Sequence, residues 1–549
     1  MMTIIPLALS LSLLMPAAGA PPKTKAPASR PASAANAYRK AADTVITPDA
    51  ARDYLMFIAS DALQGRDTPS PGLDAAAEFL AFNMKKWGVK PGGDKGTYFQ
   101  DIFLTRARLD KEKTMASLDG RVLKYTDDFV AAQTSAGTFN RGDAKGMMVY
   151  VGHGWQWKSK GVDPYEGLDV KGKVLVVSTA MPPDMPWKDG KSGVDYLPPA
   201  VVAQKLGAVG IVILTSGDDA SWKQKVRQFE QANNRANFGR IQDPVEVVPA
   251  VPTIAVSPAV SAALVNGEGM DLPTATDSKA SKGKAFAPAK VAQFTVTRDI
   301  NRQRTQNVVG IIEGTDPKLK AEYVAIGAHY DHVGVRTNAL EGTDRIFNGA
   351  DDDGSGTTGV LQIAEAFAKG PKPKRSLIFV WHCGEEKGLW GSEFFADHPT
   401  VPIESIVAQL NIDMIGRSKK AGDQDRRNAD LSGPNGIYVI GSRMLSSELG
   451  KVSDSVNAGY LKLNFDFRYD APDDPNRFYY RSDHYNYAKK GIPIIFYFDG
   501  VHEDYHQVGD EPQKIDYEKL TKVARTVHAT AVAVGNAPAR PKVDGKARD

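Results

Sequence analysis

The spacing of apolar residues changes along the chain, and each spacing predicts a different kind of structure. Between residues 51 and 87, apolar side chains return every three or four positions, which predicts amphipathic helices. Gly65 and the Pro–Gly segment 69–72 interrupt this pattern, so we expect two helical pieces rather than one. Residues 98–104 are predicted to form a strand.

Residues 130–296 have a different pattern, in which short apolar strands alternate with short helices. This region contains one histidine, His153, and no cluster of acidic residues and histidines at ligand spacing. Its simplest interpretation is a separate small α/β unit that forms a lid or contacts a partner. The predicted strands are 173–177, 211–214 and 251–256, and the predicted helices are 201–206 and 258–265.

From Asn307 onward, apolar strands alternate with helices such as 359–368. This alternation predicts an α/β fold, a central sheet with helices on both faces. Ligands of such sheets bind at the carboxyl ends of the strands. The predicted strands are 308–312, 323–328, 377–381, 407–412, 437–440 and 492–497.

The two ends of the chain have a different character from the rest. Residues 4–15 form an apolar run, and Ala18-Gly19-Ala20 supplies the small residues of a cleavage site. We therefore expect a signal peptide at 1–20 and an exported protein, periplasmic or secreted; an uncleaved membrane anchor is the alternative. Residues 21–38 are expected to be a disordered linker and residues 536–549 a disordered tail.

Charge and cysteine content exclude several kinds of protein. With 68 Lys and Arg against 65 Asp and Glu, the net charge is +3, which argues against a nucleic-acid-binding surface. The single cysteine, Cys383, excludes a disulfide framework and a cysteine-rich zinc site. Any metal must therefore be bound by histidines and carboxylates. Seven of the nine histidines fall between His329 and His506, and we expect the chemistry there.

Side chains that bind metals follow the ends of the predicted strands in this last region. Because these ends meet at one edge of the sheet, we expect the side chains to converge. They are His329 and Asp331 after strand 323–328, the loop Asp351-Asp352-Asp353, Glu385 and Glu386 after strand 377–381, Asp413 after strand 407–412, and His502 and His506 after strand 492–497.

This set has the composition of a site for two metal ions. Two divalent cations about 3.5–4 Å apart need a shared carboxylate, and each also needs a terminal carboxylate and an imidazole. Zinc suits such nitrogen and oxygen donors, and manganese or cobalt could replace it. Glu386 would bind metal, while Glu385 would face a water molecule as its general base. Asp331 is placed to orient the imidazole of His329.

Simpler interpretations remain for single members of the set. Residues 351–354 could form a turn or a calcium loop, although the EF-hand spacing is absent. The segment 354–356 lacks the lysine of a phosphate loop. Cys383 could be a nucleophile, but packing at a buried strand end is the simpler role. Ser482-Asp483-His484 is not a catalytic triad by composition alone, because neighbouring side chains point apart.

The complete set of motifs resembles the M28 family of zinc metallopeptidases. The motifs occur in the order of that family. They are His329-Tyr330-Asp331, Gly349–Gly356, Glu385–Ser392, Asn411–Gly416, Ser482-Asp483-His484 and Tyr505-His506. Segments 167–173 and 207–210 resemble a protease-associated (PA) domain. The resemblance implies a mixed central sheet flanked by helices, in a peptidase domain at 39–129 and 297–535 with a PA domain inserted at 130–296.

The resemblance also implies roles for individual residues. His329 and Asp413 would bind one Zn²⁺, Glu386 and His506 the other, and Asp352 would bridge them, with Glu385 as the general base and Tyr505 stabilising the oxyanion. A cis peptide bond is implied between Asp352 and Asp353. The family usually has Phe at the third position after Ser-Asp-His, where this chain has Tyr487.

We therefore expect an exported exopeptidase with two Zn²⁺ ions that acts on peptides, and we favour an aminopeptidase. A carboxypeptidase is the first alternative, because Arg477 and Arg481 could bind an α-carboxylate. A glutaminyl-cyclase-like acyl transferase and a peptide-binding protein with a vestigial site are the others. Nucleic-acid binding and membrane insertion after leader cleavage are not expected. The PA unit is expected to restrict substrates to short peptides.

Overall fold

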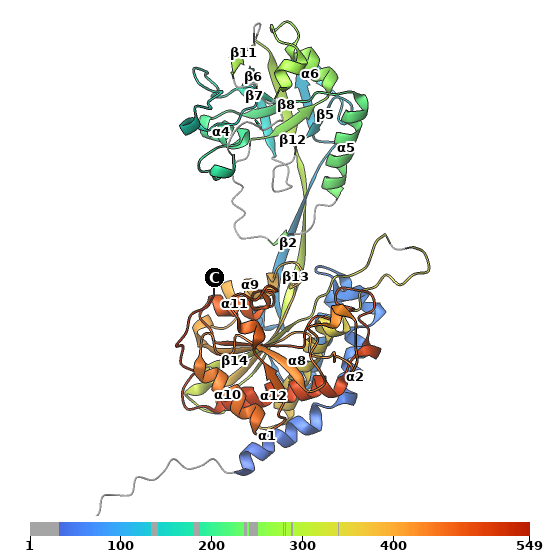
Figure 1. The fold of residues 1–549 in the computed structure, drawn as a ribbon, viewed down its shortest axis with the longest axis vertical. Helices are drawn as coiled ribbons and strands as arrows, with labels where there is room; N and C mark the ends of the chain where they lie inside the picture. Colours follow the sequence, from blue (N-terminus) through green and yellow to red (C-terminus); the bar gives the residue numbers. More distant parts are fainter. Residues whose placement is uncertain are drawn as a thin grey trace, which may run out of the picture.

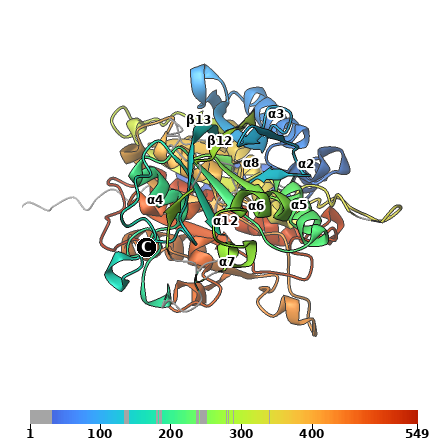
Figure 2. The same cartoon turned by 90° about the horizontal axis from the view of Figure 1, so that it is seen from above.

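The computed structural model describes residues 32–548, except 133–140, 179–181, 183–186, 235–238, 241–250, 278, 280–281, 287–288 and 339. Its elements form two units, one above the other, that two long strands connect (Figure 1). Seen from above, the second unit lies over the first (Figure 2). The predicted signal peptide lies outside the described residues. Helix α1 (Ala32–Val45) begins inside the predicted linker 21–38, so the linker prediction is wrong for residues 32–38.

The first unit contains a mixed ten-stranded sheet. Its central strands β15, β14, β16 and β19 run parallel, and the antiparallel strands β13 and β17 lie on either side of them. This arrangement confirms the predicted α/β class with a mixed sheet. The strand order is β18 (Asn464–Asp466), β17 (Gly436–Ile440), β19 (Ile494–Phe498), β16 (Ile406–Ile412), β14 (Tyr323–His329), β15 (Ser376–His382), β13 (Arg298–Ile312), β2 (Phe99–Leu109) and β9 (Gly239–Arg240), with β1 (Lys90–Pro91) paired to β13.

Helices cover both faces of this sheet, as parallel strands require. Alternate residues of β14 face opposite cores: Val324 and Ile326 belong to one and Ala325 to the other. The first core is closed by α1, α2 (Pro48–Ile58), α3 (Pro71–Lys86), α8 (Gly356–Lys369), α10 (Ser447–Ala458) and α12 (Tyr517–Asn536), and the second by α9 (Trp390–Asp397) and α11 (His484–Lys489). Among the described residues, no helix combines the length and apolar content needed to cross a bilayer.

The break predicted within residues 51–87 is present, and capping residues explain it. Ser70 accepts a hydrogen bond from the backbone N–H of Leu73, and Pro71 occupies the first position of α3. Both features favour the start of a helix. A short 3₁₀ helix, Asp61–Arg66, fills the gap between α2 and α3.

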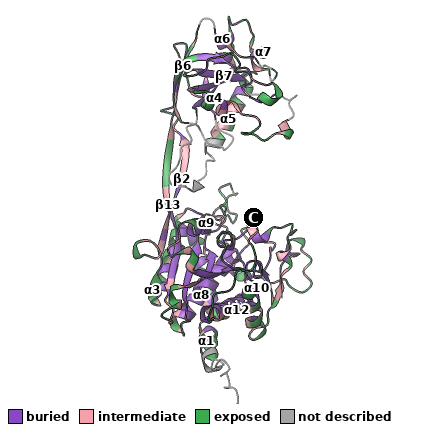
Figure 3. Cartoon of the chain, turned by 90° about the vertical axis from the view of Figure 1, so that its left-hand side faces the viewer, coloured by how far each residue is buried: buried purple, intermediate pink, exposed green. Residues whose placement is uncertain are grey.

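Strands β2 and β13 form the ribbon that joins the two units. They pair in antiparallel fashion from Phe99 opposite Val308 to Leu109 opposite Arg298. The ribbon between the units is coloured mostly exposed and intermediate (Figure 3), and Ile300 is 47% exposed. The sequence predicted only the ends of these strands that lie in the first unit, 98–104 and 308–312. The ribbon residues beyond those ends are mostly polar and partly exposed, so they lack the apolar alternation that predicts a strand.

The second unit is built on its own nine-stranded sheet and has separate cores. The predicted strands 173–177, 211–214 and 251–256 are present, as is the helix at 258–265. The strand order is β4 (Arg121–Leu123), β3 (Met115–Leu118), β12 (Val291–Val296), β6 (Gly142–Tyr150), β7 (Val174–Ser178), β8 (Gly210–Leu214), β10 (Thr253–Val256) and β5 (Phe129–Ala131), with β11 (Lys284–Ala285) paired to β6. Its helices are α4 (Pro199–Leu206), α5 (Asp219–Asn234), α6 (Pro258–Val265) and α7 (Leu272–Thr276).

The segment after α12 lies along the first unit. The carboxylate of Asp544 accepts hydrogen bonds from the backbone N–H (2.9 Å) and hydroxyl (2.6 Å) of Ser447. The guanidinium of Arg548 donates to the carbonyl of Asp470 at 2.6 Å. The prediction of a disordered tail at 536–549 is therefore wrong for residues 537–548. Its polar composition suggested disorder, but these charged side chains find partners on the folded unit.

Candidate metal centre

The residues predicted at strand ends converge at one edge of the first sheet. Strand β14 ends at His329, and the loop that carries Asp352 leads directly into α8. Glu385 and Glu386 follow β15, and Asp413 follows β16. His506 lies in the loop after β19.

Two groups of possible ligand atoms share the carboxylate of Asp352. In the first group, His329 Nε2 lies 3.3 Å from Asp352 Oδ1 and 3.5 Å from Asp413 Oδ1. In the second, His506 Nε2 lies 3.1 Å from Asp352 Oδ2 and 3.0 Å from Glu386 Oε2. Donors placed tetrahedrally about 2.0–2.2 Å from a metal ion lie roughly 3.3–3.6 Å apart. The first group has this spacing, and the atoms of the second group lie a few tenths of an ångström closer together.

The neighbouring aspartates have other partners, which leaves Asp352 for the shared position. Asp351 accepts a backbone N–H from the loop after β16 at 2.7 Å. Asp353 accepts a backbone N–H from the same loop at 3.1 Å. The carboxylate of Asp510 accepts the backbone N–H groups of Asp351 and Asp352 at 3.0 and 3.1 Å. The peptide bond between Asp352 and Asp353 is cis, as the resemblance implies.

Burial and charge indicate that this cluster is suited to cations. Asp352 Oδ2, Glu386 Oε1 and His506 Nε2 are buried atoms with no hydrogen bond to any described residue, and buried charges of this kind are costly unless paired or coordinated. Burial alone would raise the pKa of Asp352, but His329 and its other histidine neighbours hold it well below its usual value. The donors are nitrogen and oxygen atoms without thiolates, a set that suits zinc.

Glu385 lies beside the first group, with Oε2 3.9 Å from His329 Nε2. Burial raises its pKa well above the usual value; His329 opposes this shift, whereas the carboxylates of Glu386 and Asp413 add to it. A raised pKa is the property expected of a carboxylate that both takes and returns a proton near neutral pH.

Asp331 supports this arrangement in a different way from the one predicted. Its carboxylate accepts a hydrogen bond from the hydroxyl of Thr68 at 3.1 Å and from the backbone N–H of Glu385 at 3.2 Å. The Nδ1 atom of His329 lies 3.6 Å from this carboxylate but 3.2 Å from the backbone carbonyl of Asp331. Asp331 therefore fixes the backbone of Glu385 and approaches His329 mainly through its carbonyl.

Residues 482–484 also have separate roles. The hydroxyl of Ser482 donates to Asp413 Oδ2 at 2.6 Å and accepts from the amide of Asn411 at 2.9 Å. A ring nitrogen of His484 contacts the carbonyl of Tyr479 at 2.8 Å. The serine therefore orients Asp413, and the three residues do not form a triad. Cys383 is fully buried, and burial raises the pKa of its thiol, which disfavours a nucleophilic role.

A small cavity of about 30 Å³ opens beside the first group of donors. Tyr505 and Arg481 line it together with Glu385, and Arg481 Nη2 donates a hydrogen bond to the Tyr505 hydroxyl at 3.2 Å. Burial raises the pKa of Tyr505, so its hydroxyl keeps its proton. Arg477 stacks on Tyr480 at 4.7 Å. The apolar residues of the wall are Met414, Phe478, Phe496, Phe498 and Val501.

Three further buried residues lie near the cluster, and of these only His502 was among the side chains expected at the strand ends. His332 Nδ1 lies 2.8 Å from Glu386 Oε1, His502 Nε2 lies 3.3 Å from Asp351 Oδ2, and Arg66 is fully buried. The available signal was proximity in sequence, because both histidines lie within four residues of a predicted ligand.

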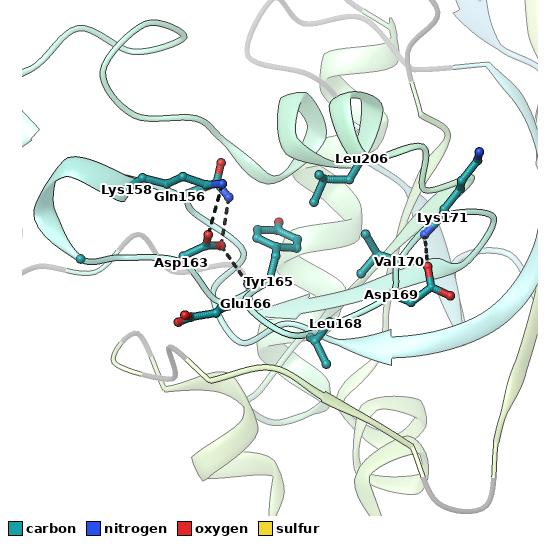
Figure 4. Close-up of a pocket in the computed structure, with 11 residues that line it drawn as sticks. Gln156, Lys158, Asp163, Tyr165, Glu166, Leu168, Asp169, Val170, Lys171 and Leu206 are labelled. Carbon is teal, nitrogen blue, oxygen red and sulfur yellow. Dashed lines mark hydrogen bonds and ion pairs between the residues drawn. The ribbon is translucent and has the colours of Figure 1, made fainter.

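A larger pocket of about 670 Å³ lies in the second unit (Figure 4). Its two aspartates have local partners. The carboxylate of Asp163 accepts from the amide of Gln156 at 2.9 Å and from the backbone N–H of Tyr165 at 3.2 Å, and Asp169 accepts from the backbone N–H of Lys171 at 3.2 Å. The residues that line this pocket include no histidine, so the pocket lacks the chemistry of the centre in the first unit.

Residues 307–531 match the family model described as Peptidase family M28. Over this segment the chain is similar to that family, in agreement with the resemblance seen in its motifs. A "Probable zinc metalloprotease" of Pyrenophora tritici-repentis is 28% identical over 256 residues, covering 43% of this chain and 58% of that protein. "Aminopeptidase YwaD" of Bacillus subtilis is 24% identical over 342 residues, covering 61% of this chain and 65% of that protein.

The match spans between 49% and 59% of the length of the first three curated relatives. Among solved structures, the "Aminopeptidase from Aneurinibacillus sp. strain AM-1" is 17% identical with a TM-score of 0.43, covering 93% of this chain and all of that one.

Proposed function

We propose that this protein is a zinc aminopeptidase with two metal ions per chain. The observation that carries the proposal is the carboxylate of Asp352, which two groups of donors share, with Glu385 beside them. Manganese or cobalt could replace zinc at such donors. The choice of an aminopeptidase is supported by relatives with that name, including a "Probable leucine aminopeptidase" of Trichophyton verrucosum that is 27% identical over 251 residues.

His329 and Asp413 would hold one ion, Glu386 and His506 the other, and Asp352 both. The chemistry that bound zinc supplies is polarisation of the scissile carbonyl and a lowered pKa for the attacking water. Glu385 takes a proton from that water and returns it to the leaving amine. The backbone N–H of Glu385 is fixed by Asp331, which keeps the carboxylate directed at the cavity.

Tyr505 would stabilise the negative charge that develops on the carbonyl oxygen. Its hydroxyl keeps its proton because burial raises its pKa, so it can donate a hydrogen bond to the oxyanion. Arg481 donates to the oxygen of this hydroxyl. That contact leaves the tyrosine proton free to point into the cavity.

A carboxypeptidase is the second candidate, and the position of Arg481 favours it. This guanidinium lines the cavity beside Glu385 and Asp413, where it could bind the α-carboxylate of a peptide. Hydrolysis of leucine p-nitroanilide but not of N-blocked dipeptides would support the aminopeptidase. The reverse preference would support the carboxypeptidase.

Export and the role of the second unit are parts of the same proposal. The apolar run at 4–15 with its small-residue cleavage site supports export to the periplasm or medium. The second unit, which resembles a PA domain, is proposed to limit substrates to short peptides. Its position on a two-stranded ribbon above the peptidase domain supports such a role (Figure 1).

The decisive experiment replaces the proposed base while keeping the metals. Glu385→Gln should retain two zinc ions per chain by elemental analysis and lose on the order of 10²–10⁴-fold in kcat. Glu365→Gln is a matched control, because Glu365 is also a buried glutamate but binds the Tyr54 hydroxyl. Near-normal turnover of Glu385→Gln would show that the base is assigned wrongly. Wild-type protein that binds no metal would overturn the proposed function.

A further inference from the structure

His332 is buried next to the centre with no hydrogen-bonding partner for its ring. Its side chain is fully inaccessible to solvent, and neither ring nitrogen makes a hydrogen bond to any described residue. Nδ1 nevertheless lies 2.8 Å from Glu386 Oε1 and 3.7 Å from Asp352 Oδ2. Buried polar atoms almost always have a partner, so a ring that approaches two carboxylates without bonding to them needs an explanation.

The surrounding structure holds this ring in place. The backbone N–H of His332 donates to the carbonyl of Arg66 at 3.2 Å. A β-carbon at Gly349 would lie 2.5 Å from Cγ of the ring, so glycine is needed for the ring to pack there. The ring of His506 lies edge-on to it, with centroids 5.6 Å apart.

We propose that His332 is a fourth protein ligand of the metal ion held by Asp352, Glu386 and His506. This inference rests on the proposed function and deepens it. The ligand atoms of these four residues all lie within 4.8 Å of one another. His332 Nδ1 lies 2.8 Å from Glu386 Oε1 and 3.7 Å from Asp352 Oδ2, so the pair with Glu386 has to widen by only about 0.5 Å to reach the spacing of two ligands of one zinc ion.

The two metal positions then differ in the number of protein ligands, four in one and three in the other. Four protein donors close a tetrahedral zinc site, whereas three leave a position open for water or substrate. The other group contains three donors, His329, Asp352 and Asp413, and the same three residues line the cavity. The ion beside His332 is therefore held tightly, while the ion beside Asp413 exchanges more readily and meets the substrate.

The rival explanation is that His332 only donates a hydrogen bond to Glu386. An asparagine variant distinguishes this role from that of a metal ligand. The amide nitrogen of asparagine can occupy the place of Nδ1 and donate a hydrogen bond, but it is a poor zinc ligand. His332→Asn should therefore behave like His332→Ala if His332 is a ligand. His528→Gln is the control for loss of a buried histidine, since His528 lies in α12 against Phe367.

The test titrates zinc into metal-free protein against a competing chelator and counts the bound ions by elemental analysis. Wild type and His528→Gln should bind one ion tightly and a second more weakly. In His332→Asn and His332→Ala the tight ion should bind at least about tenfold more weakly. Wild-type affinity in His332→Asn would overturn the inference while leaving the centre intact. Wild-type protein that binds no zinc would overturn both.

A measurement on the wild type keeps the inference testable if the variants fold poorly. The visible absorption of Co²⁺ is stronger in four-coordinate than in six-coordinate sites. The first equivalent of Co²⁺ added to metal-free wild type should give the stronger, four-coordinate spectrum. A weak six-coordinate spectrum for that first equivalent would overturn the inference.

Discussion

Replacement of Arg66 by methionine should destabilise the first unit, because this side chain ties three segments of the chain together. The fully buried guanidinium donates to the carbonyls of Tyr330 (2.9 Å), Ile58 (2.5 Å), Asn348 (2.7 Å) and Gly349 (2.9 Å). These carbonyls belong to the end of α2, the segment after β14 and the loop before Asp352. Burial lowers the pKa of Arg66 to about 10, with the nearby aspartates opposing the shift, so it stays charged at neutral pH.

The magnitude follows from the number of hydrogen bonds. A hydrogen bond to a charged group contributes roughly 1.5–3 kcal/mol, so four set a ceiling of about 6–12 kcal/mol. Relaxation and entry of water reduce this loss, and breaking a buried charged network typically costs about 3–5 kcal/mol. We expect that loss for Arg66→Met. Nη1 alone contacts both Ile58 and Asn348, so an ammonium group there would keep two of the four bonds. Arg66→Lys should lose about half as much.

Differential scanning calorimetry of the metal-free protein measures this effect. In large domains a loss of 1 kcal/mol in the free energy of unfolding lowers Tm by about 2 °C. The Tm of the first unit should therefore fall by about 6–10 °C in Arg66→Met. Arg39→Met is the control, because Arg39 is exposed and donates one hydrogen bond, to Gly459 at 3.0 Å; its Tm should hardly change. A change within 1 °C in Arg66→Met, or equal losses in the lysine and methionine variants, would refute this reasoning.

Three further predictions concern other parts of the chain. Asp352→Ala should lose both metal ions, and two ions per chain by elemental analysis would contradict the shared carboxylate. Burial lowers the pKa of His528 from 6.5 to about 3, so the neutral side chain stabilises the folded protein fully above pH 6.5. As the pH falls from 6.5 toward 3, the unfolded chain binds a proton that the folded one does not, and stability decreases. At pH 5 the loss in the free energy of unfolding is about 2 kcal/mol. His528→Leu should lose that much less on acidification from pH 8 to 5 in urea unfolding, and an unchanged pH profile would contradict this assignment. Replacing residues 110–297 by an Asn-Gly turn should raise kcat/KM for long peptides relative to short ones, and an unchanged ratio would contradict the proposed restriction.

The central sheet and the convergence of the site could be predicted because both leave local signals. Buried strands such as β14 and β16 are largely apolar, and the residues just after them must meet at one edge. The ribbon shows the limit of this approach. Except for Ile300, Arg298 to Gln303 are polar, and all six are exposed or intermediate, so their strand conformation depends on pairing with β2 rather than on their own pattern.

His332 and the tail could not be predicted, because their environment comes from tertiary contacts. The one local signal for His332 is its position three residues after His329; its burial depends on the packing of Gly349 and Glu386 around it. Likewise Asp544 lies in a polar segment that resembles a linker, and its partner Ser447 is distant in sequence.

The ribbon has a mechanical consequence. The chain leaves the first unit at Leu109 and returns at Arg298, which lie opposite each other, so removal of the segment between them keeps the order of the remaining strands and takes only the short edge strand β9 from the first sheet. Strand β13 continues downward beside β15, and β15 leads to the loop that carries Glu385. A rotation of the second unit would therefore twist β13, and the hydrogen bonds between β13 and β15 would transmit that twist toward the loop that carries Glu385.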